Sequence, residues 1–313
     1  MSFLRYKQVI EVGDLVVAYL TRESASVIRI EAGAKLNNRY GEFPHDSMIG
    51  KEYGSKLASR TGRGFIHLLY PTPELWTTVL PHRTQILYLP DIAFITGQLD
   101  LKPGSRVVES GTGSGSFSHA LARTVAPHGH LYTFEFHQAR ADQARKEFSE
   151  HGLDGITTLA CRDACKEGFG LEGEADAVFL DLPAPWEAVA SAKKALDPRK
   201  IGRICCFSPC IEQVQRTRQV LNQEGFTEIR MFEALSKSCD VKATKTLSVD
   251  EESSKTRRHL LTRRGIPTSL DEEGGDGGQE KDDRLVTKFP VEVRGHTSYL
   301  TFATLVPTVD PSQ

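Results

Sequence analysis

Three glycines at alternate positions follow a short apolar run about a third of the way along the chain. The run is Arg106–Ser110, the glycines are Gly111, Gly113 and Gly115, and a helical pattern comes after them. A strand, a glycine-rich turn and a helix start together form a nucleotide site. Glycine lets the backbone approach the ligand, and the free N–H groups of the first helical turn point at it. The alternative is a tight turn that binds nothing, but turns this rich in glycine are seldom only structural.

The spacing of these glycines separates two kinds of nucleotide ligand. They are arranged G-x-G-x-G, whereas the dinucleotide-binding pattern is G-x-G-x-x-G, and Glu109 stands two residues before the first glycine. A carboxylate at that place favours a cationic ligand over a diphosphate. The pattern therefore indicates S-adenosylmethionine, which carries an ammonium and a sulfonium. It disfavours a nicotinamide cofactor, and with it a dehydrogenase.

Carboxylates stand at the ends of four successive expected strands. Glu109 ends the first strand, Glu135 ends the second, Asp163 follows the third and Asp181 ends the fourth. Because the carboxyl ends of parallel strands border one crevice, we expect these four side chains to converge. Glu135 stands where an acid typically receives ribose hydroxyls, and Asp163 stands where a carboxylate can accept the amino group of adenine.

The fourth acid begins the segment Asp181-Leu-Pro-Ala-Pro-Trp186. Two prolines and a tryptophan form a rigid, flat wall beside a carboxylate. Such a wall suits a planar base held by stacking and by hydrogen bonds from its amino group. We therefore predict that Asp181 is catalytic and that Pro183 and Trp186 contact a base. The alternative is a proline-rich turn whose tryptophan caps the core.

From residue 106 onward, apolar strand patterns alternate with helical patterns. Repeated strand–helix units predict an α/β domain with a doubly wound, parallel sheet. The expected strands are 106–110, 130–136, 156–161, 175–182, 203–208, 228–235 and 298–304, and the expected helices are 116–125, 138–150, 186–196 and 211–224. The last strand returns after a long excursion, and we expect it to be an antiparallel edge.

Two other parts precede this pattern. Residues 1–70 hold short alternating runs separated by glycines, at 14–19, 26–30 and 65–70, which predicts a small β-rich domain. Residues 71–105 are expected to be a connecting helical segment, with one helix near 90–99.

The large domain is expected to span 106–313, with an insertion at about 240–288 that we expect to be disordered. The stretch 271–280 is acidic and rich in glycine, which is typical of a disordered loop. The basic stretch 255–264 is either a solvated face or a patch for RNA contact or nuclear import.

The bulk composition restricts the class of protein. The 313 residues carry a formal net charge of −2, which excludes a stand-alone basic nucleic-acid binder. The six cysteines form no C-x-x-C pair. We expect free thiols rather than zinc at Cys161 and Cys165, and no metal. The first residues do not form a signal peptide and no apolar run has membrane-spanning length, so we expect an intracellular protein without membrane contact.

These motifs resemble those of class I S-adenosylmethionine-dependent methyltransferases and, more closely, of the catalytic subunits of tRNA (adenine-58-N1) methyltransferases. The resemblance extends to residue 304 without the insertion. It rests on Pro81-His-Arg-Thr-Gln-Ile86, Glu109-Ser-Gly-Thr-Gly-Ser-Gly-Ser116, Glu135-Phe-His-Gln138, Asp181-Leu-Pro-Ala-Pro-Trp186, Phe207-Ser-Pro-Cys-Ile-Glu-Gln-Val214 and Tyr299-Leu-Thr-Phe-Ala303.

The resemblance implies a Rossmann-like domain of seven strands, the last antiparallel, preceded by a small N-terminal β domain. It implies methylation of N1 of adenine 58 in tRNA with S-adenosylmethionine as the cofactor. The cofactor-binding residues that it implies are Leu87, Glu109, Gly111, Gly113, Ser114, Gly115, Ser116, Glu135, Arg140, Asp163, Ala164 and Asp181, and the substrate-binding residues are His82, Arg83, Thr84, Gln85, Pro183 and Trp186.

The resemblance also implies an assembly of four subunits. Prokaryotic members are homotetramers, and eukaryotic members pair the catalytic subunit with a related non-catalytic subunit that helps to hold the tRNA. We therefore expect a heterotetramer, located in the nucleus or otherwise in the cytoplasm. Two alternatives remain open, namely a methyltransferase for another substrate, such as protein carboxylates or a metabolite, and a non-catalytic RNA-binding or assembly subunit of the same fold.

Overall fold

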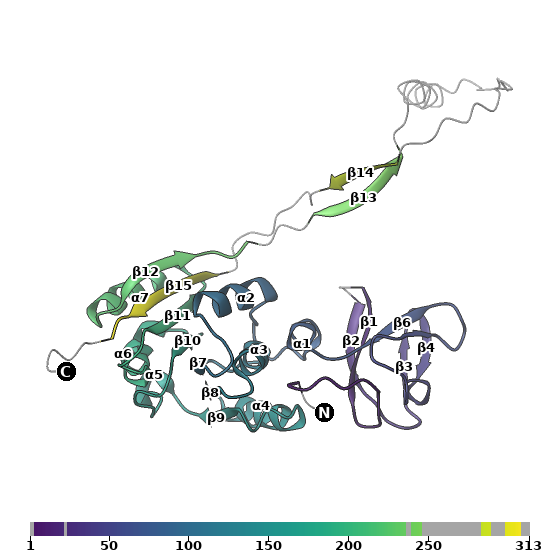
Figure 1. Cartoon of the computed structure of the whole chain (residues 1–313), viewed down its shortest axis with the longest axis horizontal. Coiled ribbons are helices and arrows are strands. Elements are labelled where there is room, and N and C mark those ends of the chain that lie inside the picture. The colour runs from purple at the N-terminus through teal and green to yellow at the C-terminus, as the bar shows by residue number, and fades with distance from the viewer. Residues whose placement is uncertain (1–2, 22–23, 236–238, 246–282, 289–297, 308–313) are drawn as a thin grey trace, which may run out of the picture. The chain divides into compact units, whose positions relative to one another are not determined.

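The computed structural model describes residues 3–21, 24–235, 239–245, 283–288 and 298–307. The chain divides into two compact units, one made of residues 1–234 and 296–313 and the other of residues 235–295. The first unit contains a seven-stranded sheet and a separate small β domain, both labelled in Figure 1.

The large sheet has the strand order β12-β15-β11-β10-β7-β8-β9. The five strands in the order β11-β10-β7-β8-β9 run parallel to one another, whereas β15 runs antiparallel to both β11 and β12. The strands are β7 (Arg106–Ser110), β8 (His130–Glu135), β9 (Thr157–Cys161), β10 (Ala177–Leu180), β11 (Gly202–Ser208), β12 (Thr227–Phe232) and β15 (Tyr299–Leu305). The predicted α/β domain with a doubly wound sheet is confirmed.

The expectation that the last strand forms an edge is wrong. β15 lies between β11 and β12, and the edge strand is β12. The reason is its apolar character: Leu300, Phe302 and Ala303 are buried. A strand inserted between two neighbours pairs its backbone groups on both sides, whereas an edge strand leaves one row without ladder partners.

Helices cover both faces of this sheet. α3 (Ser116–Val125) and α4 (Gln138–Glu150) pack on one face together with α1 (Pro73–Val79) and α2 (Leu89–Gln98). α5 (Ala164–Glu167), α6 (Pro185–Ala195) and α7 (Ile211–Gln223) pack on the other face (Figure 1).

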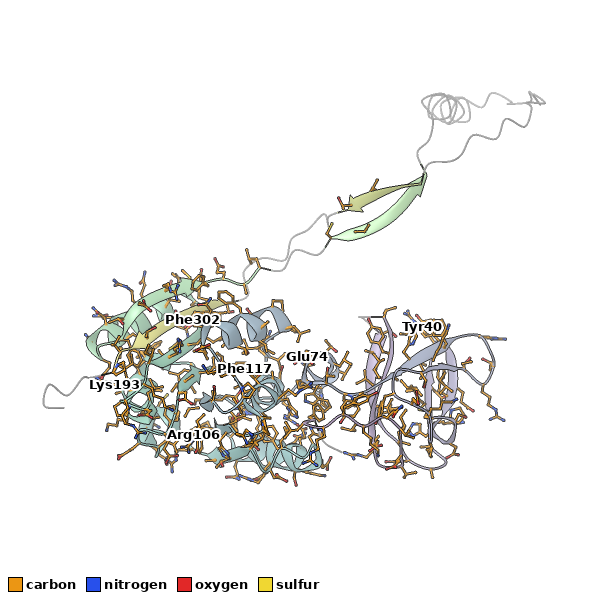
Figure 2. All side chains as sticks on the ribbon, in the orientation of Figure 1. Tyr40, Glu74, Arg106, Phe117, Lys193 and Phe302 are labelled. Atoms are coloured by element: carbon orange, nitrogen blue, oxygen red, sulfur yellow. The ribbon has the colours of Figure 1, made fainter. Side chains whose placement is uncertain are left out.

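Successive residues of the central strands alternate between these two cores. Val107 and Cys205 belong to the core beneath α3, and Val108 and Cys206 belong to the core beneath α6. Phe117, labelled in Figure 2, packs edge-on against the strand residue Phe179 with ring centroids 4.8 Å apart.

The N-terminal domain is a four-stranded antiparallel sheet with the order β2-β1-β6-β5 and a separate β3–β4 hairpin. It has a core of its own, which includes Val16, Phe43 and Leu68. Its elements are β1 (Leu15–Thr21), β2 (Ser24–Arg29), β3 (Lys35–Asn38), β4 (Gly41–Pro44), a 3-10 turn (His45–Ser47), β5 (Lys56–Ala58) and β6 (Phe65–Leu69). The strands β3, β4 and β5 are too short, and β3 too polar, for their pattern to predict them.

The connecting segment contains α1 as well as the expected α2. Thr72 caps α1, since its Oγ1 accepts a hydrogen bond from the Leu75 N–H at 3.3 Å, and Pro73 occupies the first helical position. Residues 81–88 then run between the two helices without regular structure. We call residues 81–87 the strap.

The second unit contains β13 (Asp240–Lys245) paired antiparallel with β14 (Asp283–Lys288). The two ends of the expected insertion therefore form a strand pair. The stretches 255–264 and 271–280 lie outside the described residues.

Candidate active site

Positive φ angles set the course of the glycine loop between β7 and α3. The φ angles are +98° at Gly111, +54° at Gly113 and +75° at Gly115. A Cβ at Gly111 would lie 2.3 Å from the carbonyl oxygen of Asp181, and a Cβ at Gly113 would lie 2.8 Å from the hydroxyl of Thr84. Only glycine meets both demands, a left-handed backbone and a close approach to neighbouring segments.

Glu109 is the most deeply buried of the four predicted acids, with 1% of its surface exposed. Its Oε2 accepts hydrogen bonds from the hydroxyls of Ser118 at 2.6 Å and Thr133 at 2.7 Å. Burial raises the pKa of Glu109 to about 7, against the lowering effect of these hydrogen bonds, and the charges of Asp181 and Glu135 add to the rise. A cation that entered this site would favour the ionised form.

Glu135 is held by donors from the loop and the following helix. One carboxylate oxygen accepts the Gly113 N–H at 2.9 Å, and the other accepts the His137 N–H at 2.9 Å and the guanidinium of Arg140 at 2.8 and 3.0 Å. Its side chain is almost fully buried. These bonds fix the carboxylate at the carboxyl end of β8, where it faces the cavity beside the glycine loop.

Asp181 follows β10, and its backbone N–H donates to the Ser110 carbonyl at 2.9 Å. Within the described ranges, no donor reaches its carboxylate. Burial raises the pKa of Asp181 to about 7, and the charge of Glu135 adds to this rise. The residue is half-buried and lines both cavities, so a ligand there can supply the donor that its carboxylate lacks, which marks Asp181 as a ligand-facing group.

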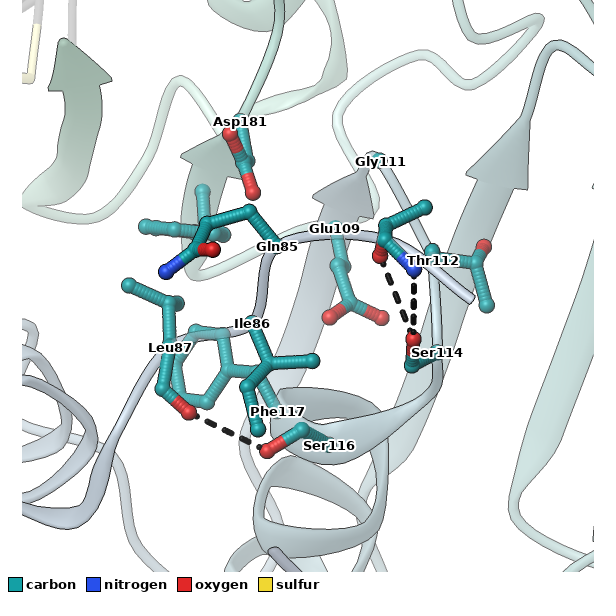
Figure 3. Close-up of a pocket in the computed structure, with 13 residues that line it drawn as sticks. Gln85, Ile86, Leu87, Glu109, Gly111, Thr112, Ser114, Ser116, Phe117 and Asp181 are labelled. Carbon is teal, nitrogen blue, oxygen red and sulfur yellow. Dashed lines mark hydrogen bonds between the residues drawn. The ribbon is translucent and has the colours of Figure 1, made fainter. Parts of the chain in front are cut away.

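The strap is fastened to the glycine loop. The Ser114 hydroxyl accepts the backbone N–H groups of Arg83 at 2.9 Å and Thr84 at 3.1 Å, and the Ser116 hydroxyl donates to the Leu87 carbonyl at 3.2 Å. Figure 3 shows the last of these bonds, with Ser116 at the start of α3.

Two cavities meet at the glycine loop. The inner cavity has a volume of about 30 Å³, lies beside Glu109 and is covered by the strap (Figure 3). The outer cavity has a volume of about 570 Å³, which is within the range of small-molecule sites, and extends past Glu135 and Asp163. Both cavities are lined by Thr84, Gln85, Gly111, Gly113 and Asp181.

Most of the predicted site residues line these cavities. Besides the shared five, the inner cavity is lined by Leu87, Glu109, Ser114 and Ser116, and the outer one by Glu135, Arg140, Asp163, Ala164 and Pro183. Asp163 also caps α5, because its Oδ1 accepts the Cys165 N–H at 3.1 Å.

Four predicted site residues do not line either cavity. His82 is exposed, and Gly115 is the N-cap residue of α3 at the end of the glycine loop. Arg83 forms a two-pronged ion pair with Glu147 of α4, at 2.5 and 3.0 Å, so its guanidinium is engaged away from the cavity. Trp186 lies under the guanidinium of Arg216, which is 5.4 Å from its ring centre. The positions of these two side chains therefore do not support substrate binding by Arg83 or contact of Trp186 with a base.

Several lining residues escaped the sequence prediction. Phe136 is 63% exposed at the outer cavity, beside Glu135, and Leu182 stands next to Asp181. An exposed aromatic directly after a strand-end acid is the signal that could have found Phe136, since an aromatic ring offers a face to a planar ligand. Ile86 and Thr112 complete the inner wall.

In the part of the chain that the structure describes, no group of three or more His, Cys, Asp or Glu residues could hold a metal ion, and all six cysteines are free. None of the helices among those residues has both the length and the apolar character that crossing a membrane requires.

The arrangement can hold a ligand that is cationic at one end and planar at the other. Glu109 and Asp181 offer negative charge where the cavities meet. Glu135 and Asp163 offer acceptors along the outer cavity, where Phe136 offers a ring face. These features match the chemical groups of an adenosyl sulfonium.

Comparison with known proteins identifies the family. The family model described as tRNA methyltransferase complex GCD14 subunit matches residues 64–305. The chain is 43% identical over 334 residues to the tRNA (adenine(58)-N(1))-methyltransferase catalytic subunit of Candida albicans, covering 98% of this chain and 99% of that relative. It is 49% identical over 256 residues to the corresponding subunit of Schizosaccharomyces pombe, covering 80% of this chain and 70% of the relative.

A solved structure of a SAM-dependent O-methyltransferase from Thermotoga maritima superposes with a TM-score of 0.73 and 26% identity, covering 96% of this chain and 95% of that one. The resemblance inferred from the motifs is thus confirmed, as is the prediction that the chain is an enzyme of the methyltransferase class. The chain belongs to the family of tRNA methyltransferase complex GCD14 subunits.

Proposed function

We propose that this chain transfers a methyl group from S-adenosylmethionine to N1 of adenine 58 in tRNA, the reaction for which its relatives are named. One observation carries the proposal: Asp181 stands where the two cavities meet, and no donor of the described residues satisfies its carboxylate.

The chemical character of the residues that line the two cavities supports this choice of cofactor. Glu109 and the strap residue Leu87 would border its methionine end, and Glu135 with Arg140 would take the ribose. Asp163, Ala164 and the exposed ring of Phe136 would border the adenine. The inner cavity has room for about one water molecule, so the strap has to yield when the methionine end enters. When bound, the cofactor supplies an electrophilic methyl group on a positively charged sulfur.

The chain's own work is positioning and electrostatic stabilisation. N1 of adenine has an available lone pair, so no strong general base is required. In its ionised form, Asp181 would accept a hydrogen bond from the N6 amino group of the target and orient N1 toward the methyl. As the bond from N1 to carbon forms, the ring gains positive charge, and the same carboxylate stabilises that charge.

The target atom lies on the Watson–Crick edge of the base. The base must therefore leave its pairing or stacking before it reacts, and the tRNA must be gripped elsewhere. A chain with a net charge of −2 offers little overall attraction to RNA. We propose that a related non-catalytic subunit supplies basic surface in a heterotetramer. The nuclear location remains a prediction from the resemblance.

Labelled S-adenosylmethionine and total tRNA, with and without the co-purified partner, test this function. We expect label in tRNA, mapped to N1 of adenine 58. Label confined to protein or to a small metabolite would contradict the choice of substrate. Cofactor binding without transfer in the complete assembly would favour a non-catalytic subunit.

A further inference from the structure

The segment Phe207–Val214 is one of the motifs that led to the family, yet it does not line either cavity. Its residue Gln213 lies in the first turn of α7. The side-chain Oε1 of Gln213 accepts the backbone N–H of Cys210 at 3.1 Å, and its Nε2 donates to the carbonyl of Pro183 at 3.0 Å. A backbone N–H only donates and a carbonyl only accepts, so these partners fix the orientation of the amide.

Pro183 belongs to the loop that runs from Asp181 to the start of α6 at Pro185. The Asp181 end of this loop is held by the hydrogen bond to Ser110. Beyond it, the Ala184 carbonyl accepts the Glu187 N–H of the first turn of α6 at 3.0 Å and receives a weak contact from the Cys165 thiol at 3.9 Å. As a proline, Pro183 has no N–H to donate, so its carbonyl is its one backbone anchoring group. Among the described residues, the bond from Gln213 is therefore the shortest hydrogen bond that ties this half of the loop to an element other than α6.

We propose that Gln213 is a positioning residue for methyl transfer, which holds the Pro183 wall in place beside Asp181 so that the target base is presented to the methyl donor. The proposal rests on the proposed function. Gln213 does not touch the cavity itself and acts through Pro183, which does line it.

Loss of the hydrogen bond from Gln213 to Pro183 should slow catalysis without weakening cofactor binding. Glu109, Glu135 and the glycine loop are attached to β7, β8, α3 and α4, and none of their hydrogen bonds involves α7. Loss of one such hydrogen bond corresponds to about a fivefold change in rate if the bond is needed to place the base. Small displacements of reacting groups add to this loss.

A pair of substitutions separates the two bonds of the amide. Gln213→Glu retains an acceptor for the Cys210 N–H, because glutamate serves as well as glutamine at this position of a helix N-terminus. It loses the donor and sets a carboxylate against the Pro183 carbonyl. Gln213→Ala loses both bonds. Gln215→Glu is the matched control, since it makes the same change of charge at an exposed position of the same helix.

The experiment measures S-adenosylmethionine affinity, melting temperature and the turnover number on tRNA with the partner subunit present. We expect Gln213→Glu to lower the turnover number about five- to tenfold relative to Gln215→Glu, with cofactor affinity and melting temperature matching the control. Gln213→Ala should show a similar loss of turnover and a lower melting temperature.

Equal turnover in Gln213→Glu and Gln215→Glu would overturn the proposal. A parallel loss of cofactor affinity in Gln213→Glu would also overturn it, because the residue would then support the fold rather than position the base. Failure of the proposed function has a different signature, in that the unsubstituted complex would not methylate tRNA.

Discussion

Replacing Glu109 by glutamine should make the cofactor-free protein more stable and its cofactor binding weaker. The carboxylate is fully buried, and its pKa is about 7 in the folded chain, compared with 4.5 for an exposed glutamate. An acid whose pKa is raised by folding contributes stability below its unfolded pKa and loses it as the pH rises through the folded value. The contribution of Glu109 to wild-type stability should therefore fall between pH 4.5 and pH 7.

The pKa difference corresponds to about 3 kcal/mol of unfolding free energy at pH 8. A glutamine carries no charge, and the hydroxyls of Ser118 and Thr133 can still bond with its amide. We expect Glu109→Gln to raise the melting temperature of the cofactor-free chain by roughly 5 °C at pH 8 and to leave it nearly unchanged at pH 4.5.

Cofactor binding should change in the opposite direction. The variant lacks the negative charge that attracts a cationic ligand, so S-adenosylmethionine should bind roughly tenfold more weakly at pH 8. In the wild type, affinity should fall as the pH drops from 8 to 6, because Glu109 takes up a proton. The variant should keep only the part of this dependence that is due to Asp181.

Calorimetric titration and thermal unfolding across this pH range measure both effects. Asp142→Asn serves as the control, since it removes a carboxylate from the exposed face of α4. A Glu109→Gln protein that is less stable than the control at pH 8 and binds the cofactor as tightly would refute the electrostatic role of Glu109.

Three further outcomes follow from the same geometry. Gly111→Ala should lower the melting temperature by more than about 5 °C, because a Cβ would lie 2.3 Å from the Asp181 carbonyl oxygen at a φ of +98°; unchanged thermal unfolding would contradict the close approach. Arg83→Lys should raise the KM for the cofactor roughly threefold with little change in kcat, because lysine cannot make the two-pronged bond to Glu147 that secures the strap; steady-state kinetics would show an equal loss of kcat if the guanidinium bound substrate. Burial lowers the pKa of His119 to about 4, so its ring is neutral when folded. The contribution of His119 to the unfolding free energy should then decline as the pH falls from 6.5 to 4, by up to about 1.4 kcal/mol per pH unit, and unfolding in urea should show that difference in slope between the wild type and His119→Asn.

The repeating pattern of strands and strand-end acids made the sheet and the crevice predictable. Glu109, Glu135 and Asp181 line the cavities because each ends or follows a parallel strand. The position of each acid can therefore be predicted from the strand to which it belongs or which directly precedes it in the sequence. The position of β15 in the sheet cannot be predicted from neighbouring residues in the same way. Its place between β11 and β12 depends on pairing with strands far away in the sequence.

The direction in which side chains point was the other feature that the sequence did not predict. Trp186 stands in the first turn of α6, which begins at Pro185, and the phase of that helix directs its ring toward Arg216 of α7. Arg83 has its partner Glu147 on α4, 64 residues later, and no spacing rule links the two. The sequence identified the segments that meet at the site but not which of their side chains face the cavity.

The role of Asp181 is tested most directly by single-turnover methyl transfer with Asp181→Ala, in complex with the partner subunit and with cofactor affinity measured on the same preparation. We expect transfer to N1 of adenine 58 in tRNA, the position named for the relatives, to slow by at least about a hundredfold while the variant still binds S-adenosylmethionine. Transfer at a near wild-type rate would contradict the assignment of Asp181 as the residue that holds and stabilises the target base.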